Sequence, residues 1–184
     1  MLKYDYFATL ESLASKSAES VMLACKGEAS KPQEIYALTK SCYSLTSELE
    51  RSLFSEFLPP FDRESIAAYA HDLTSLSEAA LIYYTTKTWS GPRAHTVRFE
   101  EICTELSSMI LQSAKMMKKI KKTPSTPQSD RFRALKSQAF EMCLNIKRAK
   151  SAILSAKPSE SELSLLSEIS KAFEKSTEVM LKNI

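Results

Sequence analysis

The side chains best able to do chemistry are few in this sequence and lie far apart. The two histidines, His71 and His95, belong to no HExxH or ExxH motif. No serine lies in a G-x-S-x-G sequence, and a chain with two glycines has no glycine-rich loop to hold a phosphate. We therefore expect no enzymatic activity.

The cysteines form no CxxC pair, and each falls within a segment that we predict to be helical. We expect buried free thiols in a reducing compartment, with a metal or redox site as the alternative. The four are Cys25, Cys42, Cys103 and Cys143.

The elements that position these side chains are predicted to be helices. Apolar residues make up 43% of the 184 residues and charged residues 26%, as in soluble globular proteins. Two glycines are too few for the turns of a β-rich fold. We expect one all-α domain over residues 1–184, without a transmembrane helix and without a signal peptide, and hence a cytoplasmic protein.

Apolar residues recur at alternating steps of three and four, which predicts six helices of roughly 20 to 27 residues. The first ends near Gly27, the second follows Pro32, the third starts at Asp62 as its N-cap, and a loop covers 88–93. The positions predicted to face the core in these three helices are Phe7, Leu10, Ala14, Val21 and Ala24, then Ile35, Leu38, Cys42, Leu45 and Leu49, then Ile66, Tyr69, Leu73, Leu76, Ala80 and Tyr83.

The second half of the chain follows the same pattern. A linker covers 121–130, and Ser159 with Glu162 has the spacing of a capping box at the start of the sixth helix. The predicted core positions are Phe99, Ile102, Leu106, Met109, Met116 and Ile120, then Phe132, Leu135, Ala139, Met142, Ile146, Ala149 and Ile153, then Leu166, Ile169, Phe173, Met180 and Ile184.

These helices predict an antiparallel six-helix bundle made of two three-helix repeats, residues 1–90 and 91–184. Within each half the second hairpin turns on proline followed by acids, PPFDRES from Pro59 and KPSESEL from Lys157. Asp62 and Glu64 suit the N-terminus of a helix, so a purely structural turn is one interpretation of PPFDRE and partner docking is the other.

The stretch EFLPPFDRESI, residues 56–66, resembles the turn of PhoU-like proteins of the branch associated with Pit-type inorganic phosphate transporters. That branch carries F-x-x-P-F-D-R-E-D-I at this hairpin, and Ser65 stands where it has Asp. The matching residues are Phe57, Pro60, Phe61, Asp62, Arg63, Glu64 and Ile66. The resemblance implies a PhoU-like bundle and a cytoplasmic accessory or regulator of phosphate uptake.

The resemblance also implies metal clusters, held by E/D-x-x-x-D pairs on the second and third helix of each repeat. Carboxylates four residues apart share one helix face and can surround a hard cation. Here the implied positions have mostly lost their acids: Glu78, Glu174 and Glu178 remain, while the others are Thr39, Tyr43, Thr74, Ser75, Lys136 and Phe140. They adjoin the apolar stripes, so we expect them on the flank of the core.

We therefore expect no metal, with a metal-binding protein as the alternative. One hypothesis is that Lys136 lies beside Glu174 or Glu178, where its ammonium group replaces the positive charge of the lost metal ion. The alternative for the two glutamates is that they are ordinary solvated residues.

The charge is uneven along the chain. From Lys115 to Lys150 there are eleven Lys or Arg and two acids, a local charge of +9. Since the whole chain carries +3, the remainder carries about −6. We expect this segment to contact an acidic protein face. The alternatives are a membrane surface, nucleic acid, or a role in solubility alone. Of these we do not expect nucleic acid, because no nucleic-acid-binding motif is present. The basic patch is formed by Lys118, Lys119, Lys121, Lys122, Arg131, Arg133, Lys147, Arg148 and Lys150.

The sequence thus predicts a non-enzymatic accessory of inorganic phosphate transport that acts by protein–protein contact at the cytoplasmic face of a Pit-type permease. A position at the inner face of the membrane and self-association both stay open. The alternatives are a PhoU-like protein that binds iron or zinc, and a general helical adaptor with a basic patch that faces nucleic acid or membrane.

Overall fold

The computed structural model describes residues 4–26, 32–55, 62–89, 97–120 and 159–182, and eight positions between 121 and 158, namely 134, 137, 140, 141, 144, 147, 148 and 151. Within these residues the regular structure is entirely helical, which confirms the all-α class. The long helices are α1 (Tyr6–Lys26), α2 (Pro32–Ser55), α3 (Arg63–Trp89), α4 (Val97–Ile120) and α6 (Glu160–Lys182).

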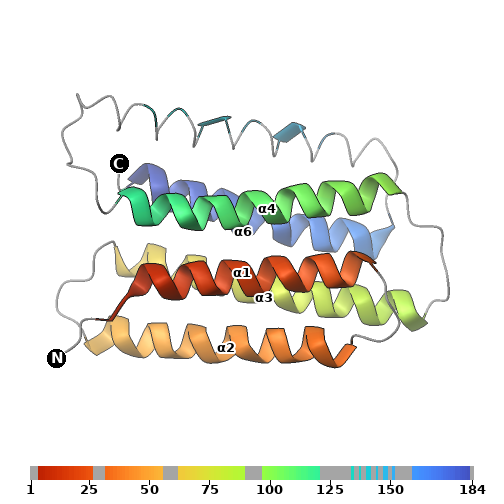
Figure 1. Ribbon diagram of the computed structural model, residues 1–184, viewed down its shortest axis with the longest axis horizontal. Coiled ribbons are helices and arrows are strands. Elements are labelled where there is room, and N and C mark those ends of the chain that lie inside the picture. The colour runs from red at the N-terminus through yellow and green to blue at the C-terminus, as the bar shows by residue number, and fades with distance from the viewer. Residues whose placement is uncertain are drawn as a thin grey trace.

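The helices run lengthwise side by side, as Figure 1 shows. Helices α1 and α3 point in one direction, and α2, α4 and α6 point in the other. Helix α1 packs against α2, α3 and α4, whereas α6 packs against α3 and α4. Helices α1, α3, α4 and α6 therefore enclose a four-helix core, and α2 covers α1 and α3 from one side.

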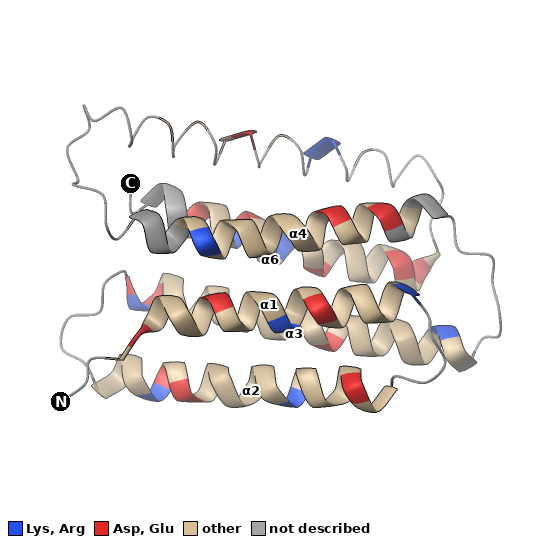
Figure 2. Cartoon of the chain, viewed as in Figure 1, with Lys and Arg blue, Asp and Glu red and all other residues tan. Residues whose placement is uncertain are grey.

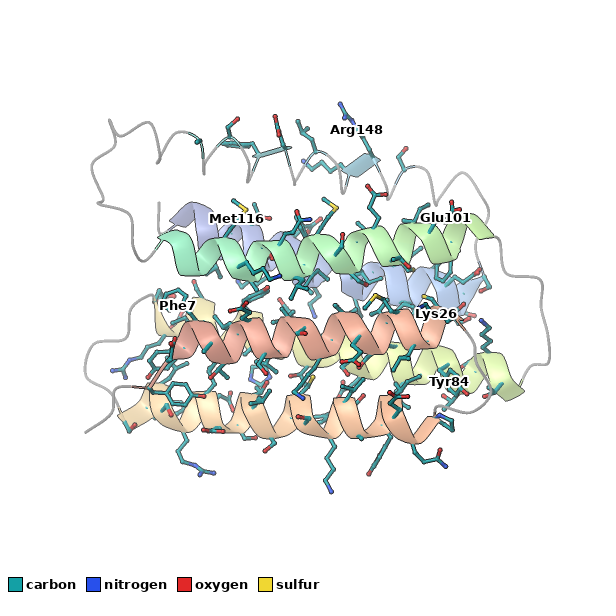
Figure 3. All side chains as sticks on the ribbon, viewed as in Figure 1. Phe7, Lys26, Tyr84, Glu101, Met116 and Arg148 are labelled. Carbon is teal, nitrogen blue, oxygen red and sulfur yellow. The ribbon has the colours of Figure 1, made fainter. Side chains whose placement is uncertain are left out.

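The predicted apolar stripes form this core. Every predicted core position of α1 and α3 is buried, as are Phe99, Leu106, Met109 and Met116 of α4. In α6 Leu166, Ile169 and Phe173 are buried. Figure 3 shows the side chains filling the space between the helices, from Phe7 at one end of the bundle to Tyr84 near the other. The predicted core of the fifth helix, with Ile120, Met180 and Ile184, lies outside the described side chains.

Local capping explains where two of the helices begin. Asp62 Oδ2 accepts a hydrogen bond of 2.9 Å from the backbone N–H of Ser65, so Asp62 is the N-cap of α3 as predicted. At α6 the N–H of Ser159 donates to Glu162 Oε2 at 2.7 Å, and the N–H of Glu162 donates to Ser159 Oγ at 3.4 Å. These reciprocal bonds confirm the predicted capping box.

The predicted loop at 88–93 starts too early. Helix α3 continues through Trp89, and in its last turn the hydroxyl of Thr88 bonds the carbonyl of Tyr84 at 3.0 Å and that of Thr85 at 2.9 Å. Helix α1 ends at Lys26, directly before Gly27, as expected. Among the described helices, none combines the length and apolarity that a membrane span requires.

Candidate functional site

The positions that the PhoU resemblance assigns to metal on α2 and α3 fall into two layers. Thr39 and Thr74 are each 5% exposed, inside the contact between the two helices. The prediction that they lie on the flank of the core is wrong for both. On α2 the buried face is Ile35, Thr39, Cys42, Thr46, Leu49 and Leu53, whereas the predicted stripe residues Leu38 and Leu45 are half-buried.

Hydroxyl groups fill the place between α1, α2 and α3 where carboxylates were implied. The Ser77 hydroxyl lies 3.0 Å from that of Thr39 and 2.9 Å from that of Ser20. A second pair joins Thr46 and Thr74, whose hydroxyl oxygens are 2.8 Å apart. Hydroxyls satisfy one another without a charge, so this contact stays in the core without a cation to neutralise it.

One thiol belongs to the same layer. Cys42 Sγ lies 3.7 Å from Ser17 Oγ, and the Ser17 hydroxyl donates to the carbonyl of Leu73 at 2.7 Å. Burial raises the pKa of the Cys42 thiol, although the bond to Ser17 acts in the opposite direction. A thiol that stays protonated is a poor nucleophile and a poor metal ligand. Cys25 and Cys103 are also buried thiols, as predicted, and Cys143 lies outside the described residues.

The second layer lies outside, on the solvent side of the α2–α3 contact. Tyr43 is 51% exposed, while Ser75 and Glu78 are half-buried, so these three occupy the flank as predicted. Glu78 is the one acid retained among them. Two further aromatic residues share the angular position of Tyr43 on α2, because spacings of seven and eleven residues return to one helix face. They are Tyr36, 61% exposed, and Phe54, 84% exposed.

A hydrogen bond also crosses this outer surface. His71 Nε2 of α3 lies 2.7 Å from Glu50 Oε1 of α2. His71 therefore supports helix packing, and we assign it no catalytic role. On the other side of α3, Lys171 of α6 lies 3.4 Å from Asp72, and the carboxylates of Glu168 and Asp72 raise the pKa of Lys171.

The corresponding positions in the second half are described in part. Glu174 is exposed, and Glu178 accepts a hydrogen bond of 3.0 Å from Lys175, its neighbour on α6. Lys136, the proposed replacement for a cation, lies outside the described residues. Phe140 is 51% exposed, the same fraction as Tyr43, its counterpart in the first half. Both halves thus present an aromatic ring where the resemblance implies a ligand.

The described positions of the predicted fifth helix are helical and exposed, and their spacing of three and four residues places them on one side of that helix. Leu144 is 54% exposed and lies four residues after Phe140, so the two share a face, with Lys147 and Arg148 one turn further. Arg148 points away from the bundle in Figure 3. This apolar and basic surface, formed by Phe140, Leu144, Lys147 and Arg148, is called the 140–148 face below.

The other predicted site residues are described incompletely. In the signature turn Asp62, Arg63 and Glu64 start α3, and Phe57, Pro60 and Phe61 lie outside the described residues. In the basic patch Lys147 and Arg148 are exposed. The side chains of Lys118, Lys119, Lys121, Lys122, Arg131, Arg133 and Lys150 lie outside the described part.

Charges are spread along all the helices, as Figure 2 shows. In the described part of the chain no three His, Cys, Asp or Glu side chains gather closely enough to hold a metal ion. The exposed aromatic residues Tyr36 and Phe54 were missed by the sequence reasoning. Their 7- and 11-residue spacing from Tyr43, away from the apolar stripe, is the signal that could have identified them.

Comparison with known proteins assigns the chain no family. No protein-family model matches it, and no curated protein matches it. In its described part the structure is an all-helical bundle with a hydroxyl-lined contact inside and aromatic residues at matching positions outside.

Proposed function

We propose that this protein is a PhoU-like accessory of inorganic phosphate transport that acts by protein–protein contact, as a bundle of two three-helix repeats. The observation that carries the proposal is the 140–148 face, where two large apolar side chains are half-exposed beside two cations. Exposed apolar residues rimmed by charge are typical of interaction surfaces.

The packing of the helices supports the two-repeat interpretation. Helix α1 contacts α4 and α3 contacts α6, while α1 contacts α3 and α4 contacts α6. Exchanging α1 with α4 and α3 with α6 leaves this set of contacts unchanged, as a repeated unit requires. The matching aromatic residues Tyr43 and Phe140, and the matching acids Glu78 and Glu178, follow the same correspondence.

The partner that suits the 140–148 face is the cytoplasmic surface of a Pit-type permease. The sequence resemblance of the PPFDRE turn points to that transporter, and Lys147 and Arg148 suit an acidic, partly apolar protein surface. Charge would favour encounter, and Phe140 with Leu144 would supply most of the affinity.

The test is co-purification of the chain with the phosphate permease of the same organism. We expect the double variant Phe140→Ser, Leu144→Ser to lose the permease, with a loss of affinity of about 30-fold or more if each side chain contributes more than 1 kcal/mol. The matched control is Leu163→Ser, which removes a 40% exposed leucine from α6 and should retain binding. Retention of the permease by the double variant would refute this surface assignment.

A further inference from the structure

The outer face of α2 carries an ordered set of exposed side chains that the 140–148 face does not use. Along one line of the helix come Tyr36, Lys40, Tyr43, Ser47 and Phe54, and Glu50 lies beside them. Among the described helices α2 packs only against α1 and α3, which leave the three aromatic rings of this face exposed; Glu50, at its half-buried edge, also lies 2.7 Å from His71 of α3. These six residues are called the α2 face below.

We propose that the α2 face is the contact between two copies of this chain, with the two α2 helices antiparallel about a two-fold axis near Leu45. The charges on the face are complementary to themselves in that arrangement. A two-fold axis at residue 45 brings Lys40 opposite Glu50 of the second copy, twice. The same axis brings Tyr36 opposite Phe54 and places Tyr43 next to the axis, opposite Ser47.

A parallel arrangement lacks this complementarity, because it would bring Lys40 against Lys40 and Glu50 against Glu50. A closed contact between identical chains also needs the same patch on both partners, which a two-fold axis provides. The aromatic residues at both ends then pack against each other, and aromatic pairs are favourable beyond the area that they bury.

A neighbouring residue of α3 extends the apolar end of the face. Ile82 is 63% exposed. It lies five residues beyond Ser77, whose hydroxyl is 3.0 Å from that of Thr39, and since α2 and α3 are antiparallel it falls beside the Tyr36 end of α2. In the two-fold arrangement Ile82 therefore adds to the surface that receives Phe54 of the second copy.

The size of the face suits a specific dimer. At exposed fractions of 61%, 51% and 84%, the three aromatic side chains present about 400 Å² per chain, or about 800 Å² for two copies. Ile82 and the polar side chains between the rings bring the total above the roughly 1,000 Å² that a specific interface needs. Phe54 is the most exposed of the three, so it gains most from a second copy.

The test is sedimentation velocity of the full chain over a series of about 1 to 100 μM, the weak end of the range for interfaces of this size. We expect a concentration-dependent dimer. Phe54→Ser should raise its dissociation constant about 30-fold or more, because the two-fold axis counts each loss twice. Helical content should not change, and neither should the melting temperature at concentrations too low for the wild type to dimerise, since the ring is 84% exposed in the single chain.

A charge exchange tests the antiparallel register itself. Lys40→Glu and Glu50→Lys should each weaken the dimer, because each places like charges opposite one another. Mixing the two variants should restore dimers of one chain of each kind, since both opposing pairs are then of opposite sign. Lys115→Glu, an exposed lysine on α4, is the matched control and should dimerise like the wild type.

Three results would overturn the proposal: a wild-type chain that stays monomeric throughout the series, a dimer insensitive to Phe54→Ser, or variants of Lys40 and Glu50 that fail to recover on mixing. A monomeric wild type would leave a different protein as the occupant of the α2 face. The α2 face and the 140–148 face share no residue, so the failure of either proposal is separate from the failure of the other.

Discussion

A carboxylate at position 39 would restore the metal ligand that the PhoU resemblance implies there. Because this position is buried, the carboxylate should destabilise the fold. Thr39 is 5% exposed, and its hydroxyl bonds the carbonyl of Ile35 at 2.9 Å and lies 3.0 Å from the Ser77 hydroxyl. Thr39→Asp would put a negative charge among hydroxyls and carbonyls inside the contact between α2 and α3. Burial of that kind raises the pKa of a carboxyl by about 3 to 5 units.

The free-energy cost follows from that shift. At about 1.4 kcal/mol per pKa unit, and with about 3 units between the unfolded pKa of about 3.9 and pH 7, Thr39→Asp should lower the free energy of unfolding by about 4 kcal/mol at pH 7. That is a large part of the 5–15 kcal/mol that holds an ordinary domain together. Since the folded-state pKa then lies at about 7 to 9, above the unfolded value of about 3.9, the penalty is full only above the folded-state pKa and disappears as pH falls toward 4.

The assay is urea unfolding followed by circular dichroism at pH 7 and pH 5, with Tyr43→Asp as the matched control. Tyr43 lies one turn further on the same helix but is 51% exposed, so its substitution should change the free energy of unfolding by less than about 1 kcal/mol. Equal stabilities for the two variants would refute the burial argument. Rescue of Thr39→Asp by added iron or zinc would do so too, in favour of a metal-binding protein.

Two further predictions concern the core and a helix start. Burial raises the pKa of Tyr69 to about 12, so the stability that depends on its neutral phenol is full below pH 10 and is lost as pH rises toward 12. Tyr69→Phe, which gives up a 3.4 Å contact with Ser113, should therefore shift alkaline unfolding to higher pH, and an unchanged midpoint would contradict this. Ser159→Ala breaks the capping box with Glu162 and should cost about 1 kcal/mol in thermal melts, whereas the exposed Ser164→Ala should cost nothing measurable.

The class of fold and most of the core could be predicted, because they follow from the spacing of the apolar residues and from the amino-acid composition. Stripes in α1 and α3 were read correctly, since their buried positions are large apolar residues that only a core accommodates. The buried face of α2 was predicted incompletely, because Thr39 and Thr46, residue types found on either side of a helix, are buried as well, while Leu38 and Leu45 are half-buried. They are buried where their hydroxyls meet hydroxyl partners on α3, and the spacing of apolar residues along α2 does not reveal those partners.

The surfaces could be predicted less well for a related reason. Tyr43 was placed correctly on the flank, but Tyr36 and Phe54 were missed, because their spacing of 7 and 11 residues from Tyr43 was not examined outside the apolar stripe. Helix starts were predictable where a side chain accepts a hydrogen bond from a backbone N–H of the first turn, as Asp62 does. The end of α3 was not, because Thr88 is a residue type as common in loops as in helices, and only the structure shows its hydroxyl bonded to carbonyls within the last turn.

The most direct test of the proposed function is site-specific photocrosslinking in living cells. A photoreactive phenylalanine analogue replaces Phe140 in one strain and Leu163, on α6, in another. The proposal predicts a crosslinked product containing the phosphate permease from position 140 and none from position 163. No permease product from position 140, or equal yields from both positions, would contradict the claim that this protein acts by contact through the 140–148 face.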